Sequence, residues 1–330
     1  INELIDNENV DINAIKYCVA IKKFNNEKEF EKEKINAELI KEIGSHKNIL
    51  QYYTDYTIAR SRGGNPFAND EDSESSYDES ELSYDESESS YDATNEYYLL
   101  YEYINGDNLF KKLKSDIDMN IKFNYYMEIL NGVKYLHDNN IVHLDLKSLN
   151  IMISNSNTVK IVDFGSMKKI SSDDQEHEFD YPSGTSYYMA PEIARQKTNY
   201  LKGADIWSLG IILYEIIYKT TPYHQINYED PITIINDISE FNIRIDIPKS
   251  EKVSSPTNKE IELTEDLNND LNDKMLGLSV LFNKIFQTEP KNRIKIDELI
   301  IKINKLIENN RSKSPVSITD LSAPPPLPPF

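Results

Sequence analysis

The chain has 330 residues, of which 39% are apolar, and a formal net charge of −20. This length allows one large hydrophobic core or two smaller ones, and no apolar run approaches the ~20 residues that a membrane span requires. Eleven acidic and no basic residues lie between Asp70 and Asp92, so much of the charge belongs to one stretch and nothing resembles a nucleic-acid-binding surface. Cys18 is the only cysteine, which excludes an internal disulfide framework. We therefore expect a soluble, cytoplasmic protein that binds neither nucleic acid nor membrane.

The first third of the chain is rich in strand patterns. Val10–Phe24 alternates and then runs apolar, which predicts two strands. Glu27–Ile43 carries apolar residues at helical spacing, and Gly44 is expected to end this helix. Asn48–Tyr56 and Glu96–Ile104 are aromatic and β-rich, so both are predicted as strands.

A low-complexity insert separates the last two of these strands. The unit Ser-Tyr-Asp-Glu-Ser-Glu occurs at Ser76–Glu81 and Ser83–Glu88 and begins again at Ser90–Asp92. Such a segment buries too little apolar surface to offset the entropy of ordering it. Residues from about 61 to 94 are therefore predicted to be disordered.

Helical patterns dominate the remainder. Helices are predicted over Leu109–Lys114, Asn120–Asp138, Asp205–Tyr218, Met275–Phe286 and Ile296–Ile307, with a strand–loop–strand region over Ile141–Val162. The chain ends in Ala-Pro-Pro-Pro-Leu-Pro-Pro-Phe, which favours polyproline II. We expect an α+β fold with a ligand cleft between two lobes. Residues 1–104 would form a small antiparallel, β-rich lobe with one helix, 105–308 a larger and mainly helical lobe, and 309–330 a disordered tail.

The segment from His143 to Asn150 carries side chains suited to phosphoryl transfer. This reaction needs metal ions on the phosphates, a cation that holds them and an acceptor for the proton of the incoming hydroxyl. In His-Leu-Asp-Leu-Lys-Ser-Leu-Asn, Asp145 would accept the proton, Lys147 would balance charge on the γ-phosphate, and Asn150 would bind Mg²⁺. Asp163, the first residue of an Asp-Phe-Gly, would be a second Mg²⁺ ligand.

In order and spacing these two motifs resemble the catalytic loop and the metal-binding Asp-Phe-Gly of the protein kinase family. Val-Ala-Ile-Lys, ending at Lys22, resembles the strand lysine that holds the α- and β-phosphates. Ala-Pro-Glu, ending at Glu192, resembles the close of the activation segment, and Arg293 its buried ion-pair partner. Asp205 resembles the aspartate that steadies the catalytic loop. The resemblance covers roughly residues 10–307 and implies a two-lobed kinase fold with ATP and Mg²⁺ as cofactors.

The same resemblance implies which hydroxyl groups are phosphorylated and which residues surround the adenine of ATP. Lys147 after the catalytic aspartate, and Thr185 in Gly-Thr-Ser-Tyr-Tyr-Met-Ala-Pro-Glu, are typical of serine/threonine kinases, and Lys147-Ser148 of their tyrosine-kinase-like branch. The family places Tyr101 as a bulky residue at the back of the pocket. Three hinge residues would lie against adenine: Glu102, Tyr103 and Ile104.

The expected glycine-rich loop over the phosphates is missing, because no glycine precedes Gly44. Either Glu3, Ile5 and Glu8 occupy its glycine positions, or Ile1 is a cut edge and the loop lies upstream.

The helix glutamate that pairs with Lys22 in the family has three candidates. Aligning the apolar pattern of the helix puts Asn36 at that position. Glu38 would require a shifted register, and Glu33 lies one turn earlier.

Leu144 stands where the family has an arginine that binds a phosphate on the activation segment. Leucine cannot make that contact. We therefore expect activity without phosphorylation of Ser171, Ser172 or Ser183.

The retained groups favour an active serine/threonine kinase that acts on protein substrates. The alternative is a weakly active or inactive pseudokinase used as a binding module, suggested by the missing loop and by Asn36. The proline-rich tail would suit an SH3, WW or profilin-like partner.

Overall fold

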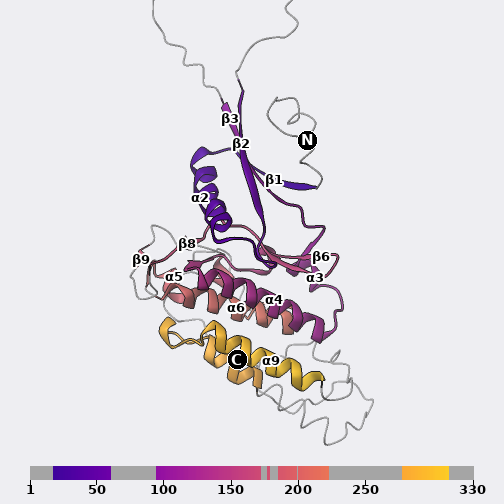
Figure 1. The fold of residues 1–330 in the computed structure, drawn as a ribbon. Helices are drawn as coiled ribbons and strands as arrows, with labels where there is room; N and C mark the ends of the chain where they lie inside the picture. Colours follow the sequence, from indigo (N-terminus) through magenta and orange to yellow (C-terminus); the bar gives the residue numbers. More distant parts are fainter. Residues whose placement is uncertain are drawn as a thin grey trace, which may run out of the picture.

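The computed structural model describes residues 18–60, 94–171, 177–178, 185–198, 200–222 and 277–311. They form a sheet with one helix beside it and, below these, a mainly helical part (Figure 1). The expected α+β architecture, with its antiparallel β-rich N-terminal region and helical C-terminal region, is confirmed. Residues 61–93 of the predicted insert and 312–330 of the predicted tail lie outside the described residues, whereas Thr94 belongs to a strand and 309–311 continue the last helix.

The N-terminal sheet has the order β1-β3-β2 and is antiparallel throughout. From Tyr97 onward every second residue of β3 is buried, namely Tyr97, Leu99 and Tyr101, because successive side chains of a strand point to opposite faces. The Tyr97 ring stacks on Phe30 of the neighbouring helix, with 5.0 Å between the centroids. The strands are β1 (Val19–Phe24), β2 (Tyr52–Arg60) and β3 (Thr94–Glu102).

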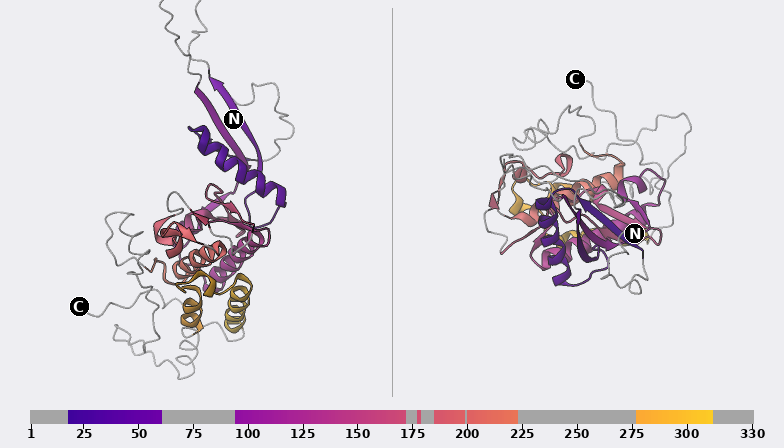
Figure 2. Two further views of the ribbon diagram at one scale, coloured as in Figure 1. Left: turned by 90° about the vertical axis from the view of Figure 1, so that its left-hand side faces the viewer. Right: turned by 90° about the horizontal axis from the view of Figure 1, so that it is seen from above.

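Helix α2 (Glu27–Ile43) has the bounds that the sequence predicts. Asn26 caps its start, with Oδ1 accepting from the backbone N–H groups of Lys28 and Glu29. Gly44 ends it at φ +95°, a conformation that costs glycine little. Figure 2 shows β2 and β3 rising together with α2 beside them.

Strand β2 begins at Tyr52, later than the predicted Asn48. The preceding residues pair with a different strand, since Leu50 N donates to the Ile161 carbonyl at 3.0 Å and Ile161 N donates to the Asn48 carbonyl at 2.8 Å. These bonds tie the N-terminal part to the helical part. Tertiary pairing therefore decides where the strand starts, rather than local propensity.

The helical part is centred on α4 (Met119–Asp138) and α6 (Leu201–Tyr218). Every residue of α6 except Lys202 is buried, as expected of a mainly apolar helix in the middle of a fold. It begins one turn before the predicted Asp205. Helix α9 (Ile296–Arg311) and a helical stretch at 277–285 close the fold. In the described part of the chain, no helix combines the length and the apolar character needed to cross a bilayer.

Short elements line the junction between the two parts. One sheet has the order β4-β6-β7, and β5 pairs with β8. These elements are β4 (Gly106–Asn108), α3 (Leu109–Lys112), β5 (Ile141–Val142), η2 (Ser148–Asn150), β6 (Ile151–Ser154), β7 (Val159–Ile161) and β8 (Lys168–Lys169). Farther along lie β9 (His177–Glu178), η3 (Ser186–Tyr188), α5 (Pro191–Ala194), β10 (Lys197–Thr198) and η4 (Pro290–Asn292).

Candidate active site

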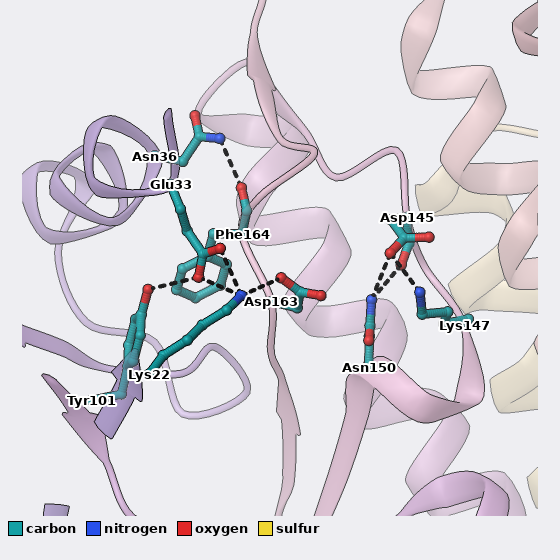
Figure 3. Close-up of polar contacts among 9 residues, drawn as sticks. All are labelled: Lys22, Glu33, Asn36, Tyr101, Asp145, Lys147, Asn150, Asp163 and Phe164. Atoms are coloured by element: carbon teal, nitrogen blue, oxygen red, sulfur yellow. Dashed lines mark hydrogen bonds and ion pairs between the residues drawn. The ribbon is translucent and has the colours of Figure 1, made fainter. Parts of the chain in front are cut away.

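Lys22 of β1 reaches from the sheet to two carboxylates. Its Nζ lies 2.8 and 2.6 Å from the two oxygens of Glu33 on α2, and 3.2 Å from Oδ1 of Asp163 (Figure 3). Because Asp163 follows β7 in the helical part, this lysine joins the two parts of the molecule. A strand lysine and the Asp-Phe-Gly aspartate, 141 residues apart in the sequence, therefore share one site.

Of the three candidate partners for Lys22, the structure has Glu33 in contact. Its side chain is only 6% exposed. Asn36 lies on the same buried face, but its Nδ2 donates instead to the Phe164 carbonyl at 2.7 Å. Glu38 is exposed. The alignment that put Asn36 at the glutamate position was therefore one turn out of register.

The charges of this cluster stabilise one another. Burial by itself would lower the pKa of Lys22, but Glu33 and Asp163 outweigh it and raise that pKa above its usual value. Burial would raise the pKa of Asp163, but Lys22 outweighs it and holds that pKa below the usual range. At neutral pH the site therefore presents an ammonium group beside an ionised Asp163.

Tyr101 closes the back of this cluster. It is 5% exposed, and its hydroxyl donates to Glu33 Oε1 at 3.2 Å. Its ring meets the Phe164 ring edge-on, with centroids 6.1 Å apart. Burial, and next the charge of Glu33, raise the pKa of Tyr101, so the hydroxyl stays protonated and can donate. The sequence predicts the bulk of Tyr101 but gives no sign of this hydrogen bond.

A second cluster lies on the catalytic-loop side. Lys147 Nζ is 2.7 Å from Asp145 Oδ2 and 2.7 Å from Thr185 Oγ1, and that hydroxyl donates to Asp145 Oδ1 at 3.0 Å. Asn150 Nδ2 donates to the Asp145 backbone carbonyl at 2.9 Å and to its carboxylate at 3.0 Å. Asp145, Lys147, Asn150 and Thr185 thus form one network. The contact from Thr185 was not predicted, although its place in the motif was noted.

The backbone of the catalytic loop is fixed from below by α6. Asp205 is fully buried and accepts from the backbone N–H groups of His143 and Leu144, each at 2.9 Å, and from His137 Nε2 at 2.8 Å. Burial would raise the pKa of Asp205, but His137 outweighs it and lowers that pKa. Leu144 adopts φ +63°, which is uncommon for a non-glycine residue, so the loop depends on these bonds to hold its shape.

The side-chain oxygens of Asn150 and Asp163 are suitable ligands for Mg²⁺. Asn150 donates through Nδ2, which leaves Oδ1 as an available oxygen. One oxygen of Asp163 meets Lys22, and Figure 3 shows that carboxylate between Lys22 and the Asp145–Asn150 pair. Among the described residues no three acidic, histidine or cysteine side chains form a ready-made metal cage. One carboxylate and one amide therefore fit an ion that keeps its waters and also binds phosphate.

The predicted hinge follows directly after β3. Glu102 does not project freely, because its carboxylate accepts from Lys160 Nζ at 2.6 Å and from Gln51 N at 2.7 Å. Tyr103 is 54% exposed, and Ile104 is partly buried against the core. Contact of this segment with adenine stays a prediction.

Comparison with known proteins agrees with this geometry. The family model of the protein kinase domain matches residues 10–302, and the chain belongs to this family. It is 30% identical over 204 residues to a probable serine/threonine-protein kinase of Dictyostelium discoideum, covering 61% of this chain and 25% of that protein. It is 34% identical over 129 residues to the serine/threonine-protein kinase chk-1 of Caenorhabditis elegans, covering 38% of this chain and 26% of that protein. It is 39% identical over 129 residues to the serine/threonine-protein kinase PSK2 of Saccharomyces cerevisiae, covering 39% of this chain and 10% of that protein. The matches span about a quarter or less of the length of these relatives. What they share with this chain is the protein kinase domain of the eukaryotic serine/threonine type.

Proposed function

We propose that the chain transfers the γ-phosphate of ATP to serine or threonine hydroxyls of a protein. The observation that carries this proposal is the contact of Lys22 with both Glu33 and Asp163, which joins the β-rich lobe to the lobe with the catalytic loop. Such a site needs little covalent chemistry from the protein, since positioning and charge stabilisation supply most of the rate.

Each side chain has a role that its contacts support. Asp145 accepts the proton of the incoming hydroxyl, and its hydrogen bonds from Thr185 and Asn150 fix its orientation. Lys147 lies 2.7 Å from Asp145 and balances charge that develops on the γ-phosphate. Lys22 holds the α- and β-phosphates. Asp163 and Asn150 would hold Mg²⁺, which, when bound, neutralises phosphate charge.

The test measures Mg²⁺-dependent incorporation of phosphate into a generic basic protein, followed by identification of the phosphorylated amino acid. Wild-type chain is expected to label serine and threonine. Asp145→Asn, which keeps the shape of the side chain but removes the base, is expected to lower the rate by about 10²–10⁴-fold. Equal labelling by both would support the pseudokinase alternative, and labelling of tyrosine would overturn the substrate class.

We propose in addition that the proline-rich tail binds an SH3, WW or profilin-like domain in the cytoplasm. The support is its composition, because a preformed polyproline helix loses little entropy on binding an aromatic-lined groove. Deleting residues 315–330 should abolish binding to such domains and leave phosphate transfer unchanged. Binding that survives the deletion would refute the proposal.

A further inference from the structure

Asn36 is a buried polar residue of α2 to which the proposed mechanism assigns no role. It is 8% exposed, and its Nδ2 lies 2.7 Å from the carbonyl oxygen of Phe164, 128 residues away. Figure 3 shows this amide directed from α2 to the backbone beside Asp163. A buried side chain–backbone bond between two separate elements constrains their relative position.

The acceptor belongs to a turn whose backbone is held in an uncommon conformation. Asp163 has φ +69°, a value that a non-glycine residue keeps only where its surroundings enforce it. The Phe164 ring is fully buried against Tyr101, and the Phe164 carbonyl also accepts from Met167 N at 3.2 Å. The bond from Asn36 is the shorter of the two and comes from outside the turn. It restrains the peptide plane that follows Phe164, one residue after Asp163.

The same helix face holds the phosphate lysine. Glu33 lies three residues before Asn36, so one face of α2 contacts both Lys22 and the Asp-Phe-Gly turn. The approach is close, because a Cβ added to Gly165 would lie 3.3 Å from Glu33 Oε2. A displacement of α2 would therefore break the lysine–glutamate pair and the Asn36 bond together.

We propose that Asn36 is a positioning residue that couples the placement of α2 to the orientation of the Asp163 carboxylate. This coupling between α2 and Asp163 acts through the Asn36 hydrogen bond and therefore needs no phosphate group on the activation segment. It accords with Leu144, which cannot bind one. The consequence for catalysis rests on the proposed function, whereas the effect on the turn does not.

The test compares Asn36→Leu with wild type in two measurements. The first is hydrogen exchange of the backbone amides of residues 162–167 without nucleotide, which should become faster in the variant. The second is the dissociation constant of a fluorescent ATP analogue with and without Mg²⁺. We expect the affinity gained from Mg²⁺ to fall by about tenfold, since the turn loses the hydrogen bond that holds it from α2 and the Asp163 carboxylate is no longer oriented for the metal. The affinity without Mg²⁺ should stay unchanged.

The matched control is Asn139→Leu. Asn139 Nδ2 also donates to a backbone carbonyl, that of Tyr135 at 2.9 Å, but at the end of α4. This control should alter neither measurement. If Asn36→Leu does not fold, Asn36→Asp keeps the shape, replaces the donor by an oxygen, and should show the same two effects at pH 7.5.

The outcomes separate this proposal from the proposed function. Wild-type exchange in residues 162–167 and a wild-type gain from Mg²⁺ in both Asn36 variants would overturn the role of Asn36, whatever the transferase activity. A wild-type chain that transfers no phosphate would overturn the proposed function. The exchange measurement would still decide on Asn36.

Discussion

Glu33 and Glu38 of α2 allow a single-residue test of the nucleotide site. Glu33 bonds to Lys22 through both oxygens, whereas Glu38 is exposed on another face. Glu33→Gln removes the charge that holds the lysine, and we expect kcat/KM for ATP to fall by about 10–100-fold, as for loss of a hydrogen bond to a charged group. Glu38→Gln is the matched control and should leave kcat/KM unchanged. An equal loss in both variants would contradict the assignment of Glu33.

Leu144 leads to a second prediction, on phosphorylation of the activation segment. It is 7% exposed, and its backbone is held by Asp205 rather than by a phosphate. Replacing Ser171, Ser172 and Ser183 together by alanine should therefore leave the transfer rate within about twofold of wild type, because leucine offers no donor to a phosphate. Phosphatase-treated wild-type chain should behave in the same way. Loss of activity in a folded alanine variant would show that another residue binds the phosphate.

The sequence predicted these residues unequally well. Asp145, Lys147, Asn150 and Asp163 stand in sequence motifs, and the structure has Asp163 beside Lys22 and the other three in one hydrogen-bonded network. The partner of Lys22 depends instead on where helix and strand meet. Helical periodicity gives the buried face of α2 but does not say which turn faces the lysine.

At the scale of elements, α6 carries a buried carboxyl group. Glu215 is 5% exposed and accepts from the Tyr188 hydroxyl at 2.7 Å, and Ser148 of the catalytic loop is 3.4 Å away. Its second oxygen has no hydrogen-bond partner within the described residues. Burial raises the pKa of Glu215 to about 7, from an ordinary 4.5. The folded chain therefore favours the neutral, protonated form of Glu215.

This pKa predicts how stability depends on pH. The pKa of Glu215 is higher in the folded chain than in the unfolded chain, so the unfolded chain releases this proton at lower pH. The stability that the protonated group contributes is therefore fully present below pH 4.5 and is lost as the pH rises through 7. The loss amounts to about 3 kcal/mol. Glu215→Gln cannot ionise, so its free energy of unfolding relative to wild type should rise by that amount between pH 4.5 and 7.5. Urea unfolding at several pH values measures this difference, and a constant difference would show that Glu215 is ionised when folded.

Element boundaries follow the sequence where the signals are local. Asn26 and Gly44 fix both ends of α2 by capping alone, and these ends were predicted correctly. The start of β2 and the start of α6 were misplaced. The first depends on pairing with Ile161, and the second begins after Tyr200 in a left-handed conformation that the sequence does not signal.

At the scale of the whole molecule, charged side chains are among the contacts that join segments far apart in the sequence. Lys22 links the sheet to the helical part, and Arg293 links the C-terminal segment to α5. The guanidinium of Arg293 bonds to both oxygens of Glu192, with Nη2 2.7 Å from Oε2, and donates to the Gly203 carbonyl at 2.9 Å. It also lies over the Trp207 ring, 4.9 Å from the centroid. The predicted ion pair with Glu192 is therefore present and is shielded from solvent.

Breaking this pair should destabilise the helical part without altering the nucleotide site. Arg293→Met keeps much of the side-chain volume but leaves Glu192 buried, charged and unpaired, which costs about 3–5 kcal/mol. Urea unfolding should show this loss, while the nucleotide dissociation constant of the folded variant stays at the wild-type value because Lys22 and Asp163 are untouched. Lys291→Met, at an exposed position of η4, is the control and should change stability by less than about 0.5 kcal/mol. If both variants unfolded alike, the pair would contribute nothing, and the stability of the helical part would have to come from its apolar contacts instead.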